Sequence, residues 1–194
     1  LILRIFMTKN KIRKSLKQEL SLMSKSEVLE KSSTIQKNLL NYLSDYKGGN
    51  SLLYKQANNE VSLDKVESYL IDLNENIFLP KVMPGNNLVF NKLDNNTALV
   101  SNKYNILEST SEELINPLDL NFIILPVLAI DHKGFRLGHG SGYYDRGLQI
   151  IPKNIKKPLI IGLGYDFQYV EKSFGESHDT RVDLMITEKN IINF

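Results

Sequence analysis

A glycine-rich segment between Arg136 and Arg146 holds the residues of this sequence best suited to binding an anion. It reads Arg-Leu-Gly-His-Gly-Ser-Gly-Tyr-Tyr-Asp-Arg, with glycine at the alternate positions Gly138, Gly140 and Gly142. Glycine takes positive φ angles at no steric cost and lets the backbone approach a ligand closely. Successive amide N–H groups of such a loop can converge on phosphate, and the N-terminus of a following helix adds positive charge. The spacing favours a phosphate-binding loop, with a tight structural turn as the alternative.

Charged residues near this loop, and others far from it in sequence, suit the same chemistry. Arg136 offers a pair of donors to phosphate. Asp145 falls in the first turn of the helix expected after the loop, where a carboxylate can hold Mg²⁺ together with phosphate oxygens. Its alternative role is to complement the helix dipole. Lys9 and Arg13 are one helical turn apart and can face one anion, although most such clusters are solvated basic faces.

The elements that must position these residues alternate between helices and strands. Apolar spacing predicts helices over residues 8–23, from Ser26 to Gly48, 62–73 and 143–151, with Leu29 (or Val28) and Leu73 on buried faces. Short strands are expected at 51–54, 77–80, 88–90, 99–101, 159–163 and 184–187, and one long buried strand at 122–130. The alternation predicts a three-layer α/β/α fold around a mainly parallel, Rossmann-like sheet. Ligands bind beyond the carboxyl ends of strands in such sheets, and the glycine loop is expected at such an end.

Composition narrows the possible functions. The chain of 194 residues is expected to form a single domain over 1–194, with residues 1–6 interpreted as an upstream extension. A net charge of +2 is too balanced to indicate nucleic acid as the main partner. There are no cysteines, which excludes disulfides and thiolate nucleophiles. No apolar run approaches the roughly 20 residues of a membrane span, so the cytoplasm is the expected compartment.

The segments 126–131 and 134–146 together resemble the signature of the 5-formyltetrahydrofolate cyclo-ligase family. Shorter segments resemble other motifs of that family: residues 9–13, Glu60-Val61, residues 79–82, residues 162–165 with Gln168, and His178-Asp179 through Asp183. The sequence departs from the usual family pattern at Ser109, Ile130, His139 and Ser141. These departures concern the details of folate contact and leave the phosphate site unchanged.

The resemblance implies closure of the 5-formyltetrahydrofolate ring to 5,10-methenyltetrahydrofolate, with ATP as co-substrate, Mg²⁺ as cofactor, and ADP and phosphate released. It implies ATP contacts from Lys9, Asn10, Lys11, Ile12, Arg13, Arg136, Leu137, Gly138, His139, Gly140, Ser141, Gly142, Tyr143 and Tyr144. It implies folate contacts from Lys55, Glu60, His139, Gly140, Ser141, Gly142 and Tyr143. Catalytic roles are expected for Arg136 and Asp145, and metal ligation for Asp145 and Asp179. A monomer that binds small molecules, and neither nucleic acid nor membrane, is expected.

Two alternatives stay open at this point. A sugar-phosphate isomerase or CoA-transferase-like enzyme of similar fold would need a carboxylate base or nucleophile beside the loop, and Glu108 is the one candidate. A non-catalytic nucleotide- or RNA-binding module would use the basic face of the first helix. The near-neutral charge argues against that second alternative.

Overall fold

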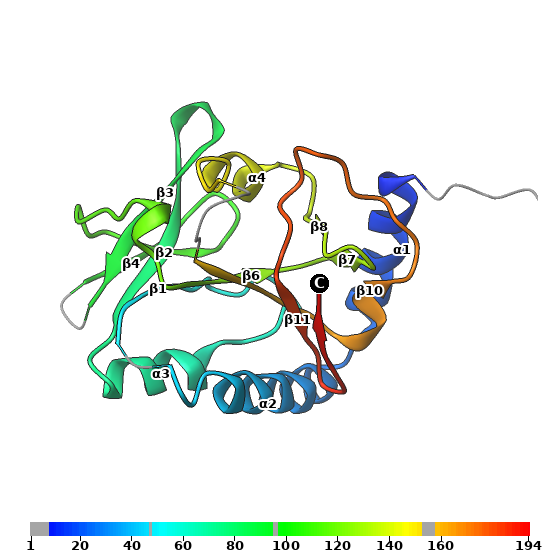
Figure 1. The fold of residues 1–194 in the computed structure, drawn as a ribbon, viewed down its shortest axis with the longest axis horizontal. Helices are drawn as coiled ribbons and strands as arrows, with labels where there is room; N and C mark the ends of the chain where they lie inside the picture. The colour runs from blue at the N-terminus through cyan, green and yellow to red at the C-terminus, as the bar shows by residue number, and fades with distance from the viewer. Residues whose placement is uncertain (1–7, 47, 95–96, 153–157) are drawn as a thin grey trace, which may run out of the picture.

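A seven-stranded sheet forms the centre of the computed structural model, which describes residues 8–46, 48–94, 97–152 and 158–194 (Figure 1). The strand order is β12-β11-β9-β6-β1-β2-β3. The inner five strands are parallel: β1 Asn50–Leu52, β2 Asn76–Met83, β6 Phe122–Pro126, β9 Leu159–Leu163 and β11 Leu184–Ile186. The two edge strands are antiparallel to their neighbours: β3 Asn87–Leu93 and β12 Ile191–Asn193. The predicted mainly parallel α/β sheet is therefore confirmed.

The helices begin at residues whose side chains can satisfy free backbone N–H groups. α1 spans Lys9–Leu22, and its N-cap Thr8 accepts a hydrogen bond from the Lys11 N–H. α2 spans Lys25–Tyr42 and begins with a capping box between Ser24 and Glu27, two residues earlier than predicted. The remaining helices are α3 Asp64–Asp72, α4 Tyr143–Gly147, and the 3₁₀ turns η1 Pro84–Asn86, η2 Pro117–Asp119 and η3 Asp166–Gln168. Because α4 has only five residues, it adds little dipole to the glycine loop.

Both faces of the central sheet are buried. One face packs against α2 and α3, which lie one after the other below the sheet in Figure 1, and α1 joins the same apolar core. The other face packs against Ile130, Val182 and, after α4, Leu148. Two apolar residues predicted to face this core do not: Leu29 is 73% exposed and Leu73 47% exposed, because each lies on the solvent side of its helix. Val28, the predicted alternative to Leu29, is half-buried.

The long strand predicted at 122–130 is in fact two strands in different sheets. β6 ends at Pro126, and β7 Ala129–Asp131 joins β8 Arg136–Leu137 and β10 Tyr169–Val170 in a separate three-stranded sheet. Side chains satisfy the carbonyl groups at the break: Arg136 Nε donates to Pro126 O, and Gln168 Nε2 donates to the oxygens of residues 127 and 128. Both segments are buried, which is why the apolar pattern is continuous across the break.

A small hairpin completes the strands. β4 Leu99–Ser101 pairs with β5 Leu107–Ser109, and β5 lies against β2. No helix in the described part of the chain is long and apolar enough to cross a membrane. Residues 1–7, including the expected upstream extension 1–6, lie outside the described residues.

The strand order creates a crevice at one place. Read in chain order, the five parallel strands are arranged 2-1-3-4-5, with the chain moving outward from β1 to β2 on one side and from β6 to β11 on the other. In open α/β sheets, ligands bind outside the carboxyl ends of the strands where the order reverses. That position lies here between β1 and β6.

Candidate functional site

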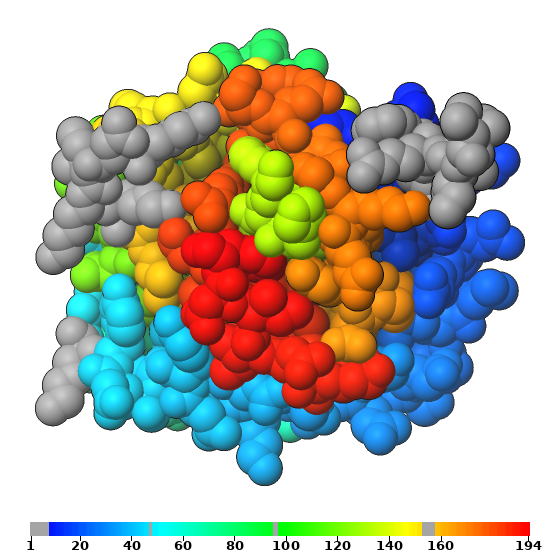
Figure 2. Space-filling model, turned by 45° about the vertical axis from the view of Figure 1, so that its right-hand side comes forward, coloured from blue at the N-terminus to red at the C-terminus, as the bar shows by residue number. Residues whose placement is uncertain are grey.

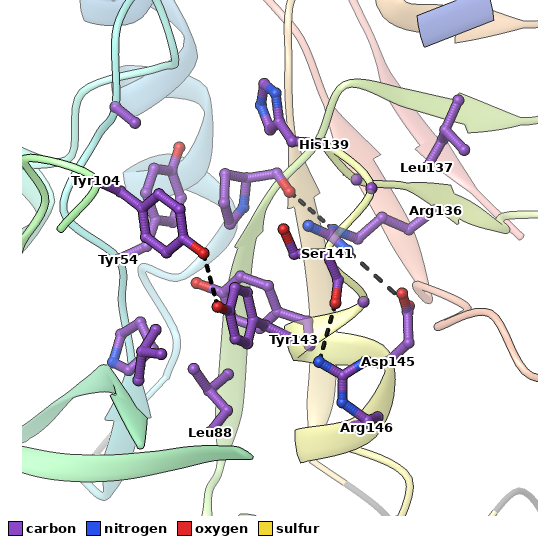
Figure 3. Close-up of a pocket in the computed structure, with 18 of the residues that line it drawn as sticks. Tyr54, Leu88, Tyr104, Arg136, Leu137, His139, Ser141, Tyr143, Asp145 and Arg146 are labelled. Carbon is purple, nitrogen blue, oxygen red and sulfur yellow. Dashed lines mark hydrogen bonds and ion pairs between the residues drawn. The ribbon is translucent and has the colours of Figure 1, made fainter. Parts of the chain in front are cut away.

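A cleft of about 800 Å³ opens at this reversal point (Figure 3). Tyr54 and Lys55, which follow β1, and Pro126, which ends β6, contribute to its lining. The glycine loop forms one wall, with His139 and Ser141 beside the opening, and Tyr104 stands on the opposite wall in Figure 3. Most of the residues predicted to bind ligands therefore come together in one cavity.

The backbone of the glycine loop leaves its N–H groups free. None of the N–H groups of residues 138–142 donates a hydrogen bond to any part of the chain that the structure describes. Gly140 has a φ of +118° and Gly142 a φ of +64°, values that favour glycine over any other residue. Gly138 and Gly142 are half-buried and residues 139–141 are exposed, so these N–H groups are open to a ligand with acceptor oxygens.

Cations from outside the loop hold its carbonyl oxygens. Arg13 Nε donates to Gly138 O at 3.1 Å, Lys17 Nζ to His139 O at 3.2 Å, and Arg146 Nη2 to Ser141 O at 2.9 Å. The carbonyl groups and N–H groups of a peptide chain point in opposite directions, so fixing the first set orients the second. These three side chains also place positive charge close to the loop.

Arg136 lies buried beneath the loop, with only 6% of its surface exposed. Its Nε donates to Pro126 O at 2.8 Å, and its guanidinium group stacks 4.9 Å from the centre of the Tyr144 ring. An added Cβ at Gly138 would lie 2.9 Å from the guanidinium nitrogens, so a side chain there would displace this group. Arg136 Nη1 is 4.0 Å from Asp145 Oδ1, beyond hydrogen-bond distance. The guanidinium group therefore keeps donors that no described residue uses.

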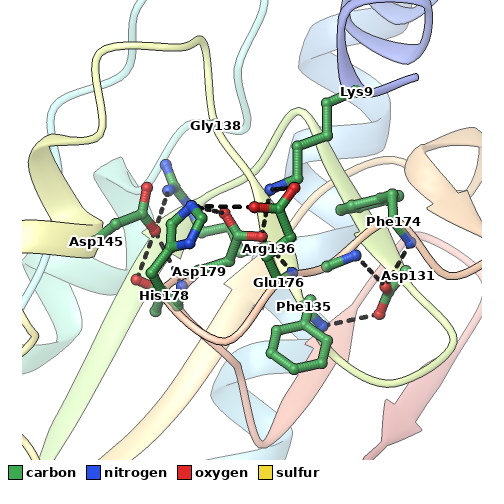
Figure 4. A network of polar contacts seen from close by, with 12 residues as sticks. Lys9, Asp131, Phe135, Arg136, Gly138, Asp145, Phe174, Glu176, His178 and Asp179 are labelled. Carbon is green, nitrogen blue, oxygen red and sulfur yellow. Dashed lines mark hydrogen bonds and ion pairs between the residues drawn. The ribbon is translucent and has the colours of Figure 1, made fainter.

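The two aspartates predicted to bind metal are each held by one oxygen (Figure 4). Asp145 Oδ1 accepts from Thr180 N at 3.0 Å and Thr180 Oγ1 at 2.8 Å. Asp179 Oδ2 accepts from Lys9 Nζ at 2.6 Å and Glu176 N at 2.7 Å. The second oxygen of each accepts no hydrogen bond from a described residue. Mg²⁺ binds through one or two carboxylates plus phosphate oxygens and waters, so this pair fits Mg²⁺ in the company of a phosphate.

A dedicated protein cage for a metal is not found. No group of three or more metal-ligating side chains comes together among the described residues. His178 Nε2 is 3.8 Å from Asp179 Oδ1, beyond hydrogen-bond distance, and the His178 side chain is 68% exposed.

Glu60 connects the loop after β1 to the glycine loop. Its Oε1 lies 3.1 Å from His139 Nε2, and its Oε2 accepts from Ala57 N at 2.9 Å. Lys55, which was also predicted to contact folate, forms an ion pair with Glu67. Both predicted residues line the cleft, and both already have protein partners.

Tyrosines form much of the remaining wall. The Tyr143 and Tyr104 hydroxyls are 2.8 Å apart and join the glycine loop to the turn between β4 and β5. Tyr54 OH donates to Val61 O at 2.8 Å. Burial raises the pKa of the Tyr54 phenol, with the nearby Glu60 charge as a second cause, so Tyr54 stays protonated. Tyr144 packs against the core, and burial likewise raises the pKa of its phenol.

The amino-acid sequence that forms this cleft is similar to the sequences of known proteins. The model of the 5-formyltetrahydrofolate cyclo-ligase family matches residues 6–188, nearly the whole sequence. The chain belongs to that family. A cyclo-ligase from Haemophilus influenzae is 30% identical over 158 residues, which cover 79% of this chain and 83% of the relative. One from Mycoplasma genitalium is 43% identical over 72 residues, covering 37% of this chain and 41% of the relative.

A solved structure supports the fold of this family member. The 5,10-methenyltetrahydrofolate synthetase of Aquifex aeolicus is 30% identical and superposes with a TM-score of 0.81. The match covers 96% of this chain and 93% of that one. The chain is therefore an enzyme of the cyclo-ligase family with the mixed α/β fold of its structural relatives.

Among the described residues, three that were predicted to contact ATP do not line the cleft. Ile12 is 4% exposed and packs in the core, because it lies on the inner face of α1. Asn10 accepts a hydrogen bond from Arg13 Nη1 at 2.8 Å and thus acts through that arginine. Lys11 is exposed, and its N–H bonds to Thr8. Lys9 and Arg13, the flanking residues of the same segment, do reach the cleft.

The sequence reasoning missed three polar contacts of the site. Lys17 was not among the predicted site residues, yet it holds the glycine loop; its position four residues after Arg13 was the available signal. Arg146 was noted only as part of the motif. Its Nη2 donates to Ser141 O in the glycine loop and also to Asn86 O at 3.0 Å, in a turn far away in the sequence. Thr180, which orients Asp145, had no local signal at all.

Proposed function

We propose that this chain uses ATP and Mg²⁺ to convert 5-formyltetrahydrofolate to 5,10-methenyltetrahydrofolate, releasing ADP and phosphate. The observation that carries the proposal is the glycine loop at residues 138–142, whose N–H groups are free while cations hold its carbonyl oxygens. Free N–H groups together with cationic side chains are suited to a polyphosphate. Membership of the cyclo-ligase family supplies the reaction class.

The chemistry needs no nucleophile from the protein. The formyl oxygen of folate attacks the γ-phosphate of ATP, and ADP leaves. The folate's own N10 then attacks the phosphorylated formyl carbon, the ring closes, and phosphate leaves. Both reacting groups belong to the substrates, so the protein must align them and stabilise the charge on the phosphate being transferred.

The described residues fit that task in defined roles. The amides of residues 138–142 would hold phosphate oxygens, and Arg13 and Arg136 would add positive charge around them. Asp145 and Asp179 each have one oxygen without a hydrogen bond and would hold Mg²⁺ beside the phosphates. Mg²⁺ bound there would neutralise developing charge on the phosphate oxygens. Lys9 bonds to Asp179 and would set the position of that carboxylate.

Folate would occupy the other wall of the cleft. That wall carries aromatic and aliphatic surface from Tyr104, Tyr143, Leu88 and Val82, which suits a flat ring system. Glu60 and His139 stand between the two walls and would be expected to contact the substrate near its reacting atoms.

The deciding experiment is a turnover assay. Purified protein is mixed with 5-formyltetrahydrofolate, ATP and Mg²⁺, and formation of the methenyl chromophore is followed. Signal that requires both ATP and Mg²⁺ would support the proposal. Absence of signal from folded protein would refute it. The same cleft in a sugar-phosphate isomerase or CoA-transferase would work without ATP, so the ATP-free reaction separates these alternatives.

We also propose that the chain works as a monomer in the cytoplasm on small-molecule substrates alone. The balanced charge, with 24 basic and 22 acidic residues, supports the lack of a nucleic-acid partner. Light scattering of the purified protein tests the monomer.

A further inference from the structure

Glu108 is a buried carboxylate in the cleft wall that the proposed reaction leaves without a role. It lies on β5, is 6% exposed, and lines the cleft. Its Oε1 accepts two hydrogen bonds, from Val82 N on β2 at 3.0 Å and from Asn102 Nδ2 at 2.7 Å. These bonds fix the carboxylate between the central sheet and the hairpin of β4 and β5.

The second oxygen of Glu108 faces open space. Oε2 accepts no hydrogen bond from any described residue. In the described part of the chain, the polar side-chain atoms that are fully buried and lack a hydrogen-bond partner are Ser51 Oγ and Asn91 Oδ1. Glu108 Oε2 also lacks a partner but is not one of them, so it is exposed to solvent. The space that Glu108 borders is the cleft. Because Oε2 is open to the cleft and has no hydrogen-bond donor among the described residues, it can accept a hydrogen bond from a ligand.

The surroundings define the ligand group. Tyr104, Ile106 and Pro80 line the same part of the cavity wall, so a planar, largely apolar ring fits beside the carboxylate. A carboxylate selects N–H donors and repels other anions. Of the two ends of a folate, the aminopyrimidine ring offers N–H donors, whereas the glutamyl end carries negative charge. Glu108 therefore fits the aminopyrimidine end.

The predicted folate ligand Glu60 is less available than Glu108. Glu60 Oε2 accepts a hydrogen bond from Ala57 N, and Glu60 Oε1 lies 3.1 Å from His139 Nε2. Glu108 has one oxygen fixed by two donors and one oxygen free. Its geometry is thus set in advance, which reduces the entropy lost on binding.

We propose that Glu108 is a specificity-determining residue whose Oε2 accepts a hydrogen bond from the exocyclic amino group of the folate's pyrimidine ring. The inference rests on the proposed function, because it names the part of the substrate that this wall of the cleft recognises. It also places the pterin at the hairpin wall and leaves the glycine loop for the phosphates.

The test is the substitution Glu108→Gln. The two donors at Oε1 hold an acceptor there, so the glutamine oxygen should take that position and its NH₂ group should replace Oε2. The variant then presents a donor to the substrate's amino group. We expect the KM for 5-formyltetrahydrofolate to rise about 10- to 100-fold, the factor associated with one hydrogen bond to a charged group. The KM for ATP should stay within about twofold.

Glu113→Gln is the matched control. Glu113 is an exposed acid that pairs with Lys92 on β3 and does not line the cleft. Both KM values should be unchanged in that variant. An unchanged folate KM in Glu108→Gln, with an unchanged melting temperature, would overturn the inference while leaving the proposed function intact.

A second measurement does not depend on the folding of any variant. Wild-type protein is assayed with an analogue of 5-formyltetrahydrofolate that lacks the exocyclic amino group. Its KM should exceed that of the natural substrate by a similar factor, and equal values would refute the assignment. If the wild type shows no ATP-dependent turnover of 5-formyltetrahydrofolate, the proposed function fails and this inference falls with it.

Discussion

The buried carboxylate of Asp131 connects two segments that are far apart in the sequence. Its Oδ1 accepts from the N–H groups of Lys133 and Phe135 at 2.9 and 3.0 Å, and its Oδ2 from those of Phe174 and Gly175 at 3.0 and 2.9 Å. In Figure 2 the turn after β7, in yellow-green, lies between the orange segment that precedes β11 and the red C-terminal strands. Figure 4 shows the carboxylate with Phe174, and, in the same view, Asp179 paired with Lys9.

The substitution Asp131→Asn tests how much this connection contributes. Asparagine has nearly the same shape, but its NH₂ group must face two of the four N–H donors. Hydrogen bonds to charged groups contribute about 1.5–3 kcal/mol each, so losing two of them should cost about 3 kcal/mol or more of unfolding free energy. That is a large part of the roughly 5–15 kcal/mol by which a domain is stable.

The loss should depend on pH in a defined direction. Burial by itself would raise the pKa of Asp131, but its four backbone N–H donors hold the pKa below the ordinary aspartate value. A lowered pKa means that the ionised group stabilises the fold above the unfolded-state pKa of about 3.9. This contribution is lost as pH falls through the folded-state pKa. The difference between wild type and Asp131→Asn should therefore be largest at neutral pH and shrink below about pH 4.

Urea denaturation followed by circular dichroism, from pH 7 down to the lowest pH at which the wild type is folded, provides the measurement. Asp72→Asn is the control, because Asp72 is an exposed acid on α3. The segment that Asp131 holds leads to Asp179, so the KM for ATP should also rise. A stability change below about 0.5 kcal/mol at pH 7, the level of an ordinary surface substitution, would refute the reasoning.

Two further substitutions test the phosphate side of the cleft. Asp145→Asn keeps an acceptor for Thr180 but loses the charge available to Mg²⁺, so most turnover should disappear at an unchanged melting temperature; wild-type activity would show that Asp145 does not hold the metal. Arg146→Ala removes the donor to Ser141 O and should raise the KM for ATP by about tenfold, equivalent to about 1.4 kcal/mol. Arg181→Ala, which removes a donor to a carbonyl away from the cleft, should leave that KM unchanged and serves as its control.

The parts of the site that sequence reasoning found are local in sequence. The glycine loop is one continuous segment, and its backbone freedom follows from the residue type itself. Lys9 and Arg13 were found because residues 9–13 resemble a motif of the family, since their helical spacing alone is more typical of a solvated basic face. The same spacing extended by one turn reaches Lys17. The mainly parallel sheet was predictable because strands alternate with helices along the chain.

Other features depend on contacts that no local pattern reveals. The break between β6 and β7 was hidden because both strands are buried, and its carbonyl groups are satisfied by Gln168 from η3. Likewise, Glu108 was considered only as a possible base, and the donors that fix it come from a different strand and from a turn. Such partners are set by tertiary packing, which is why sequence patterns could not supply them.

The ion pair between Lys9 and Asp179 joins the first helix to a loop that precedes one of the last strands. During synthesis, the glycine loop would emerge from the ribosome before Asp179 does, so the cleft would still lack this carboxylate. Contacts between residues so distant in sequence form slowly, because the intervening chain must first be ordered. The nucleotide binding that we propose should therefore appear late in folding, absent from nascent chains and present once Lys9 and Asp179 have paired.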